Sequence, residues 1–160
     1  MPRGKKRIKK RKTFPDSLFG SVLVTKLINR TMRSGKKTVA QREVYQAFTL
    51  LEEKTKKEPL SVFNLAIENI KPQMEVRPRR IGGAAYQVPA PVRGERQEAL
   101  AIRWLIQSAS TRPSKEFHTF AEKLAAEIED AAAGAGGAVK KKENVHRMAE
   151  ANKAFSHFRF

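Results

Sequence analysis

Residues 74–89 constrain the fold most, because they break the helical pattern found on both sides of them. Apolar and polar side chains alternate before and after Gly82-Gly83, which is the pattern of two strands joined by a tight turn. Pro78 and Pro89 lack the N–H that a further strand would need, so both strands must be edges. A two-stranded ribbon is only marginally stable alone in water. We therefore expect a β-hairpin that projects from the body as an arm and stays mobile until it is bound.

Apolar residues spaced three and four apart predict helices on both sides of this arm. Asp16 or Ser17 is expected to cap the first helix, Pro59 to open the third and Pro72 to end it. The glycines within residues 134–137 indicate a C-cap and a loop. The apolar stripes run over residues 18–28, 40–51, 59–70, 95–111, 117–131 and 145–155. They predict a mainly α fold, a bundle of about six helices with one projecting β-hairpin arm.

The chain has 160 residues, 40% of them hydrophobic, which is enough for one domain with an ordinary core. We expect a single helical domain over residues 13–160, with the arm at about 74–89, after a disordered basic tail over residues 1–12. The lone Trp104 lies in an apolar stripe, which favours packing in the core over stacking on a base.

The net charge of the chain is +17, and it is unevenly placed. Residues 1–12 carry +8, residues 71–103 carry +4 and residues 138–160 carry +4. Folding does not require this segregation, because self-repulsion opposes compaction. Contact between a polyanion and several parts of one protein favours it, because each phosphate contact releases counterions. Nucleic acid is therefore the expected partner.

The residues that catalysis and metal binding require are largely missing. There is no cysteine, which excludes disulfides, cysteine-ligated zinc, iron–sulfur clusters and thiol nucleophiles. Residues 34–38 are similar to a phosphate loop, but Arg30 and Lys37 stand where that motif needs Gly and Ser or Thr. His146 and Glu150 are interpreted as a solvated ion pair rather than a metal site. We expect no enzymatic activity, no catalytic residue, no metal and no cofactor.

No apolar run approaches the ~20 residues of a membrane helix, so no membrane partner is expected. The tail has no apolar stretch behind its basic start, which argues against a secretory signal. An organelle transit peptide is the less favoured alternative, because such peptides prefer Arg and Ser whereas this tail is rich in Lys.

The arm carries the sharpest signal for binding. Arg77 and Arg79 share one strand face and Arg80 lies on the other, and guanidinium forks suit phosphate groups. Tyr86 on the return strand could stack on an unpaired base. The basic face continues into the following helix through Arg93, Arg96 and Arg103.

Three other charged segments are less specific. Residues 34–38 are interpreted as a basic turn whose amides and lysines hold a phosphate. Residues 140–142 are lysines expected in the first turn of the last helix, where the helix dipole disfavours cations. A partner phosphate and ordinary solvation explain them equally well. The carboxylates of Glu127, Glu129 and Asp130 are expected to face outward, away from nucleic acid.

Longer motifs resemble one protein family over essentially the whole chain. That family is the bacterial-type seventh protein of the small ribosomal subunit. The similar runs, in the family's order, are Pro15-Asp16…Phe19-Gly20-Ser21, Asn29-Arg30…Met32…Gly35-Lys36-Lys37, Glu75-Val76-Arg77…Arg79-Arg80…Gly82-Gly83…Tyr86-Gln87-Val88-Pro89, Ala101…Arg103-Trp104, and Ala138-Val139-Lys140-Lys141…His146-Arg147-Met148-Ala149-Glu150-Ala151-Asn152-Lys153-Ala154-Phe155.

The resemblance implies a structural protein that binds the 3′ major (head) domain of small-subunit rRNA, starts head assembly and borders the tRNA exit site. Its implied partners are this rRNA, exit-site tRNA with mRNA nearby, and neighbouring small-subunit proteins, without a membrane or a homo-oligomer. The implied location is a cytoplasmic ribosome, or alternatively an organellar one. The rRNA contacts carried over by position are Arg3, Lys5, Lys6, Arg7, Lys9, Lys10, Arg11, Lys12, Lys36, Lys37, Arg77, Arg79, Arg80, Arg93, Arg96 and Arg103. The tRNA-facing positions are Gly82, Gly83, Ala84, Lys140, Lys141 and Arg147.

The chain departs from the family pattern in three places. Gly94 to Gln97 replace a Pro and a pair of arginines, the connector at 110–119 lacks an Arg-Lys-Arg run, and residues 157–160 replace a usual Tyr and Trp. The first two changes weaken the case for rRNA contacts there. The rival interpretation is an architectural DNA-binding protein with paired β-arms, whose tips insert an apolar wedge. Here the tip offers Ile81 and glycines.

Overall fold

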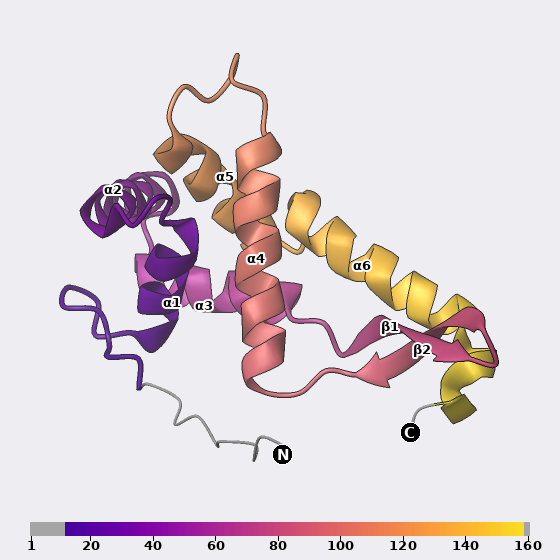
Figure 1. The fold of residues 1–160 in the computed structure, drawn as a ribbon. Helices are drawn as coiled ribbons and strands as arrows, with labels where there is room; N and C mark the ends of the chain where they lie inside the picture. Colours follow the sequence, from indigo (N-terminus) through magenta and orange to yellow (C-terminus); the bar gives the residue numbers. More distant parts are fainter. Residues whose placement is uncertain (1–11, 159–160) are drawn as a thin grey trace, which may run out of the picture.

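The computed structural model describes residues 12–158 and is mainly helical (Figure 1). Its helices are α1 (Val22–Thr31), α2 (Lys37–Thr55), α3 (Pro59–Ile70), α4 (Glu95–Thr111), α5 (Phe120–Ala132) and α6 (Gly136–Ala151), followed by the 3₁₀ helix η1 (Lys153–Phe158). The strands β1 (Met74–Ile81) and β2 (Ala84–Pro91) form one antiparallel hairpin. The expected helical bundle with a projecting β-arm is confirmed.

The core of the body lies around α5, which packs against α2, α3, α4 and α6. Figure 1 shows α4 crossing in front of α5, with α6 leading away from the body along the arm. Phe48 and Phe63 are fully buried, and their ring centroids lie 5.5 Å apart. Trp104 is also buried in this core, as its place in an apolar stripe predicts. Its indole is therefore part of the packing and is not exposed to a base.

The first helix starts later than the sequence pattern indicates. The Asp16 carboxylate accepts hydrogen bonds from two backbone N–H groups of the following turn, at 3.1 and 3.3 Å. The Tyr45 hydroxyl donates to the same carboxylate at 2.9 Å, which ties this turn to α2. α1 begins at Val22 with Ser21 as its N-cap. The predicted cap at Asp16 or Ser17 is wrong, because Asp16 is bonded to the turn and to Tyr45 instead.

An ion-pair cluster at the junction of α4, α5 and α6 corrects a second expectation. Glu127 is only 1% exposed. Its Oε2 accepts a hydrogen bond from Arg112 Nε at 2.8 Å, and its Oε1 accepts one from the backbone N–H of Ala138 at 2.9 Å. Arg112 also pairs with Asp130. Glu127 does not face outward, because it bonds to groups from both neighbouring helices. We refer to Arg112, Glu127 and Asp130 as the junction cluster.

The boundaries of α5 and α6 also differ from the expected ones. α5 begins after Thr119, which forms a capping box, so Phe117 lies in the connector rather than in the helix. α6 begins at Gly136, so Gly136 and Gly137 are helical rather than part of a loop. A Cβ on Gly137 would lie 3.1 Å from the Cβ of Ser108 on α4. Glycine at this position therefore permits the close packing of α6 on α4.

The arm is a regular hairpin in which Ile81 pairs with Ala84 across the turn. Gly82 and Gly83 have φ angles of 57° and 88°, the left-handed conformation that a type I′ turn requires at both positions. β2 continues to Pro91, beyond the expected end of the arm. Pro78 on β1 and Pro89 on β2, together with the absence of a third strand within residues 12–158, agree with two edge strands.

The arm does not stand alone on the body, because α6 runs along it and η1 packs on β2 (Figure 1). The ring centroid of Tyr86 lies 5.3 Å from that of Phe155 and 5.5 Å from that of Phe158. Phe155 and Phe158 are stacked on each other at 6.4 Å. We refer to these three residues as the aromatic clasp. The clasp supplies apolar contacts that a two-stranded ribbon lacks by itself, and it engages Tyr86, which the sequence suggested as a base-stacking residue.

Candidate nucleic-acid interface

The base of the arm holds a carboxylate between two of the predicted RNA-binding arginines. Glu75 on β1 is 6% exposed. Its Oε1 accepts a hydrogen bond from Arg77, and its Oε2 accepts bonds from Nε and Nη2 of Arg96 at 3.1 and 2.9 Å. Both arginine side chains remain 51% exposed. We refer to Glu75, Arg77 and Arg96 as the arm-base cluster.

The arm-base cluster keeps its carboxylate ionised. Burial alone would raise the pKa of Glu75, but the hydrogen bonds from Arg96 and Arg77 outweigh burial and hold that pKa below its usual value. This contact is not visible in the sequence, because Glu75 and Arg96 lie in different elements and only the fold brings them together. A carboxylate within a run of arginines is the one signal that could have drawn attention to Glu75.

The outer part of the arm presents arginines on both faces. Arg79 and Arg80 are exposed on β1. Strand alternation places Arg79 on the same face as Arg77 and Arg80 on the opposite face, as predicted. The three predicted tRNA-facing residues of the tip are all exposed, Gly82, Gly83 and Ala84.

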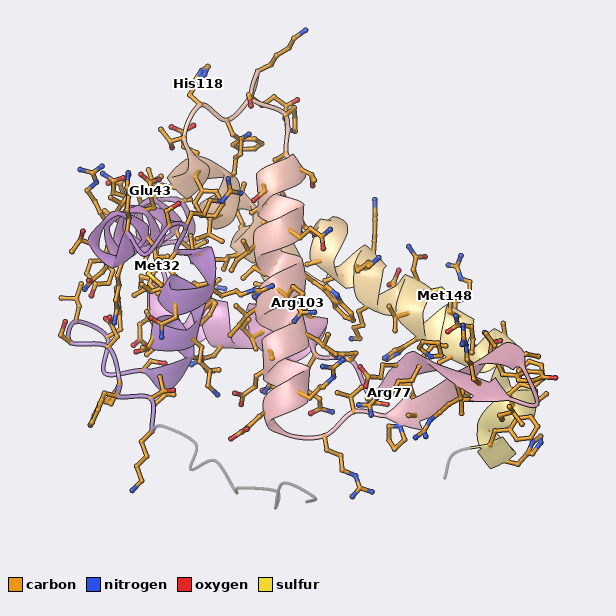
Figure 2. The ribbon with its side chains drawn as sticks, in the orientation of Figure 1. Met32, Glu43, Arg77, Arg103, His118 and Met148 are labelled. Carbon is orange, nitrogen blue, oxygen red and sulfur yellow. The ribbon has the colours of Figure 1, made fainter. Side chains whose placement is uncertain are left out.

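A basic groove of about 830 Å³ lies between α1 and α4. Arg103 on α4 lines it together with Lys12, Lys26 and Arg30, and Figure 2 shows Arg103 midway along α4. The ammonium of Lys26 is 2.6 Å from the Glu98 carboxylate, so part of its charge is compensated. Lys26 and Arg30 are not among the binding residues predicted from the sequence. Their spacing of four along the first helix, which places both on one face, is a signal that could have found them.

The two lysines at the start of α2, Lys36 and Lys37, face different surfaces. Lys37 lines a hollow of about 470 Å³ together with Lys12. Lys36 lines another hollow of about 620 Å³, together with Arg33 and Lys123. Lys37 therefore lies on the same surface as Lys12, at the start of the described chain, whereas Lys36 lies on a different surface.

α6 exposes the three remaining residues of the predicted tRNA-facing set, Lys140, Lys141 and Arg147. The lysines are not in the first turn, because α6 begins at Gly136. The predicted position in the first turn, where the helix dipole disfavours cations, is therefore wrong. Lys142 is turned inward, and its Nζ donates a hydrogen bond to the backbone carbonyl of Asn69 at 2.7 Å.

His146 joins α6 to the entrance of the arm. Its Nε2 accepts a hydrogen bond from the backbone N–H of Gln73 at 3.0 Å. Burial, and then the charge of Lys142, lowers the pKa of His146, so the ring is neutral near pH 7. No ion pair between His146 and Glu150 forms in the part of the chain that the structure describes, where His146 bonds to Gln73 instead. No group of three or more His, Asp or Glu side chains within residues 12–158 is placed to hold a metal ion.

The remaining predicted contacts divide into two sets. Arg93 is exposed at the entrance to α4. Lys12 is the first described residue. The other predicted tail contacts lie outside the described residues, Arg3, Lys5, Lys6, Arg7, Lys9, Lys10 and Arg11. None of the described helices is both long enough and apolar enough to cross a membrane.

Comparison with known proteins decides the family. The sequence model of the family described as ribosomal protein S7p/S5e matches residues 3–153. The chain belongs to the S7p/S5e family. It is 56% identical over 153 residues to a protein from Carboxydothermus hydrogenoformans, covering 96% of each chain. It is 54% identical over 156 residues to one from Thermotoga maritima (98% of this chain, 99% of the relative) and 54% identical over the full 160 residues to one from Caldicellulosiruptor bescii. All three relatives are named small ribosomal subunit protein uS7. The family resemblance found in the sequence is confirmed.

The three departures from the expected S7p/S5e pattern coincide with internal contacts. Gln97 donates a hydrogen bond from Nε2 to the carbonyl of Val92 at 2.9 Å, which fixes the chain where the arm meets α4. In the connector at 110–119, which lacks the expected Arg-Lys-Arg run, the retained Arg112 belongs to the junction cluster. Phe158 in the altered C-terminus belongs to the aromatic clasp. At these positions the chain uses its side chains to hold the arm and the connector in place.

Proposed function

We propose that this chain is a non-enzymatic structural protein of the small ribosomal subunit, which binds the 3′ major (head) domain of small-subunit rRNA and helps to start its assembly. The groove between α1 and α4 carries this proposal, because it gathers Lys12, Arg30 and Arg103 from three parts of the chain. Cations gathered in this way bind a folded polyanion by releasing its counterions. Full-length similarity to proteins named small ribosomal subunit protein uS7 supports rRNA as that polyanion.

The proposed rRNA surface continues from the groove to the arm. The arm-base cluster adds two half-exposed guanidiniums, and Arg79, Arg80 and Arg93 add further exposed ones. Lys36 and Lys37 extend the surface at the start of α2, and the tail of residues 3–12 adds nonspecific attraction. Phosphate contacts of this kind fix the position of the protein on the RNA, while the shape of the folded RNA provides specificity.

The tip of the arm and the exposed side of α6 form a second proposed surface, which borders the tRNA exit site with mRNA nearby. The glycines of the tip expose backbone without a side chain, and a Cβ on either would meet nothing within 4 Å. Lys140, Lys141 and Arg147 supply positive charge along α6. One copy of the protein acts beside neighbouring small-subunit proteins, in a cytoplasmic ribosome as the bacterial relatives suggest.

An architectural DNA-binding role is less favoured by the form of the tip. Proteins of that kind insert a bulky apolar wedge between base steps. The turn here consists of two glycines, and Ile81 beside it is partly buried. A tip of this shape suits close approach of another backbone better than insertion.

Binding to a head-domain rRNA fragment at several salt concentrations tests the proposal. Wild-type affinity should fall by about 10³–10⁵ between 50 and 200 mM salt, as expected for about six to ten phosphate contacts. Replacing Arg77, Arg79 and Arg80 with Ala should weaken binding and reduce the salt slope by about two to three, with an unchanged helical circular-dichroism signal. A matched control replaces the exposed Lys54, Lys56 and Lys57 with Gln.

The control variant should bind almost as tightly as the wild type, because its lysines lie outside the proposed surface. Equal loss in both variants would show that only net charge matters. A duplex DNA of the same length serves as competitor, and stronger binding to that duplex would favour the architectural alternative over an rRNA-binding protein.

A further inference from the structure

Glu75 is an unusual residue for a surface that binds a polyanion. It is a buried carboxylate at the base of a basic arm, in a chain with a net charge of +17. A negative charge there repels phosphate, so simple electrostatics predicts that it weakens RNA binding. Its contacts indicate a different role, because both of its oxygens are occupied by arginines.

The carboxylate holds its two arginines from different elements. Arg77 lies two residues further along β1, whereas Arg96 lies in the first turn of α4. Nε and Nη2 of Arg96 both donate to Oε2, so one edge of this guanidinium faces the protein. A guanidinium has five N–H donors in a rigid plane, and the donors that are not used by Glu75 remain for a ligand. The 51% exposure of each side chain agrees with donors that reach solvent.

Fixing an arginine before binding has an energetic consequence. A free arginine side chain loses up to about 2 kcal/mol of rotamer entropy when a ligand immobilises it. An arginine already held by a buried carboxylate has lost much of that freedom in the folded protein. The entropy cost of ordering this side chain on binding is then smaller, which is the general effect of preorganisation.

We propose that Glu75 is a positioning residue that holds Arg77 and Arg96 as a fixed pair of guanidiniums for the phosphate backbone of a folded RNA. This inference rests on the proposed function, and it assigns a role to an acidic residue on the rRNA surface. It makes a prediction opposite to that of simple electrostatics. Removing the negative charge of Glu75 weakens binding to the specific RNA, although the protein becomes more positive.

The test compares Glu75→Gln with Glu68→Gln, because both changes remove one acidic charge that pairs with a basic residue. Glu68 on α3 pairs with Lys71, the residue just after that helix, and the Glu68 side chain is 66% exposed. We expect Glu75→Gln to lose about tenfold in affinity for the head-domain rRNA fragment and to bind a nonspecific duplex no more weakly than the wild type. Glu68→Gln should bind both nucleic acids at least as tightly as the wild type. Glu75→Asp, which restores the charge, should recover part of the lost affinity.

A second variant separates positioning from folding. Arg96→Lys keeps the positive charge but cannot donate two hydrogen bonds to one carboxylate oxygen from a rigid plane. It should lose several-fold in specific affinity, and adding Glu75→Gln to it should then cost little more, because the two changes remove the same arrangement. Arg96→Lys by itself keeps Glu75, so its loss of specific affinity still tests the arrangement if a thermal melt shows that Glu75→Gln folds poorly.

Three outcomes are distinguishable. Specific affinity that is unchanged or higher in Glu75→Gln overturns the positioning role. Equal losses for specific RNA and nonspecific duplex also overturn it, because they indicate general damage. If the wild-type protein itself shows no preference for head-domain rRNA over the duplex, the proposed function fails first, and the role of Glu75 on that RNA fails with it.

Discussion

The arm-base cluster and the junction cluster contain the same two kinds of side chain in opposite proportions. At the junction, Arg112 contacts the carboxylates of Glu127 and Asp130. At the arm base, Glu75 contacts the guanidiniums of Arg77 and Arg96. The Arg112 side chain is 17% exposed, whereas those of Arg77 and Arg96 are each 51% exposed.

Under the proposed function, the same ion pair serves folding at the junction and RNA binding at the arm base. The junction has one more carboxylate than guanidinium, so its surplus charge is negative. Part of that charge is stabilised by the hydrogen bond that Glu127 accepts from the buried backbone N–H of Ala138. The surplus charge at the arm base is positive and reaches solvent, where a phosphate can meet it. An arginine in an ion pair is therefore not excluded from RNA binding, and its exposure separates the two cases better than its pairing does.

The largest effect should follow from breaking the junction cluster. Arg112→Ala leaves Glu127 buried without its cation and removes the contact of the guanidinium with the Phe117 ring. We expect a loss of about 3–5 kcal/mol in the free energy of unfolding, measured by urea denaturation. Lys115→Ala, an exposed change in the same connector, should stay within about 0.5 kcal/mol of the wild type. A loss below about 1 kcal/mol in Arg112→Ala would remove the contrast between the two clusters.

A smaller and more local effect should follow from opening the aromatic clasp. Replacing Phe155 and Phe158 with Ala removes the rings that pack on Tyr86. Aromatic pairs contribute about 0.5–1.5 kcal/mol each beyond area burial, so amide exchange in β1 and β2 should become about tenfold faster. Exchange in α5 should change little, because the clasp lies outside the core. Phe14→Ala, which alters an 80% exposed ring, is the matched control. Unchanged exchange in the arm would show that α6 alone supports it.

The helices were predictable where local chemistry marks their ends. The pattern over residues 95–111 agrees with α4 at both ends, because Gly94 precedes it and Pro113 follows it closely. Pro59 likewise marks the first residue of α3. The start of α6 was not predictable in this way, because two consecutive glycines, Gly136 and Gly137, are typical of a loop between helices. Glycine is required at these two positions because a side chain would collide with Glu127 or with α4, and only the fold brings these groups close.

The candidate site was predictable as a set of exposed cations but not as an arrangement. Arg79, Arg80 and Arg103 are exposed where strand and helix periods place them. The pairing of Arg96 with Glu75 depends on how the arm meets α4, so no local pattern contains it. Glu127 was misplaced for the same reason, since its partner Arg112 lies in a connector with no periodicity.

The smallest expected effect concerns the uncharged contact at the arm base between His146 and Gln73. The pKa of His146 is lowered by burial and then by Lys142, so the folded protein binds a proton there less readily than the unfolded chain. Stability should therefore decrease as the pH falls through the range below the usual histidine pKa of about 6.5, by no more than about 1 kcal/mol from this one contact. Thermal melts at pH 7.5 and 5.5 measure it. His146→Gln should show a smaller pH-dependent loss than the wild type, while His118→Gln, an exposed control, should match the wild type. An identical pH dependence in all three proteins would mean that the arm base is held by the charges of Glu75, Arg77 and Arg96 without a contribution from this neutral ring.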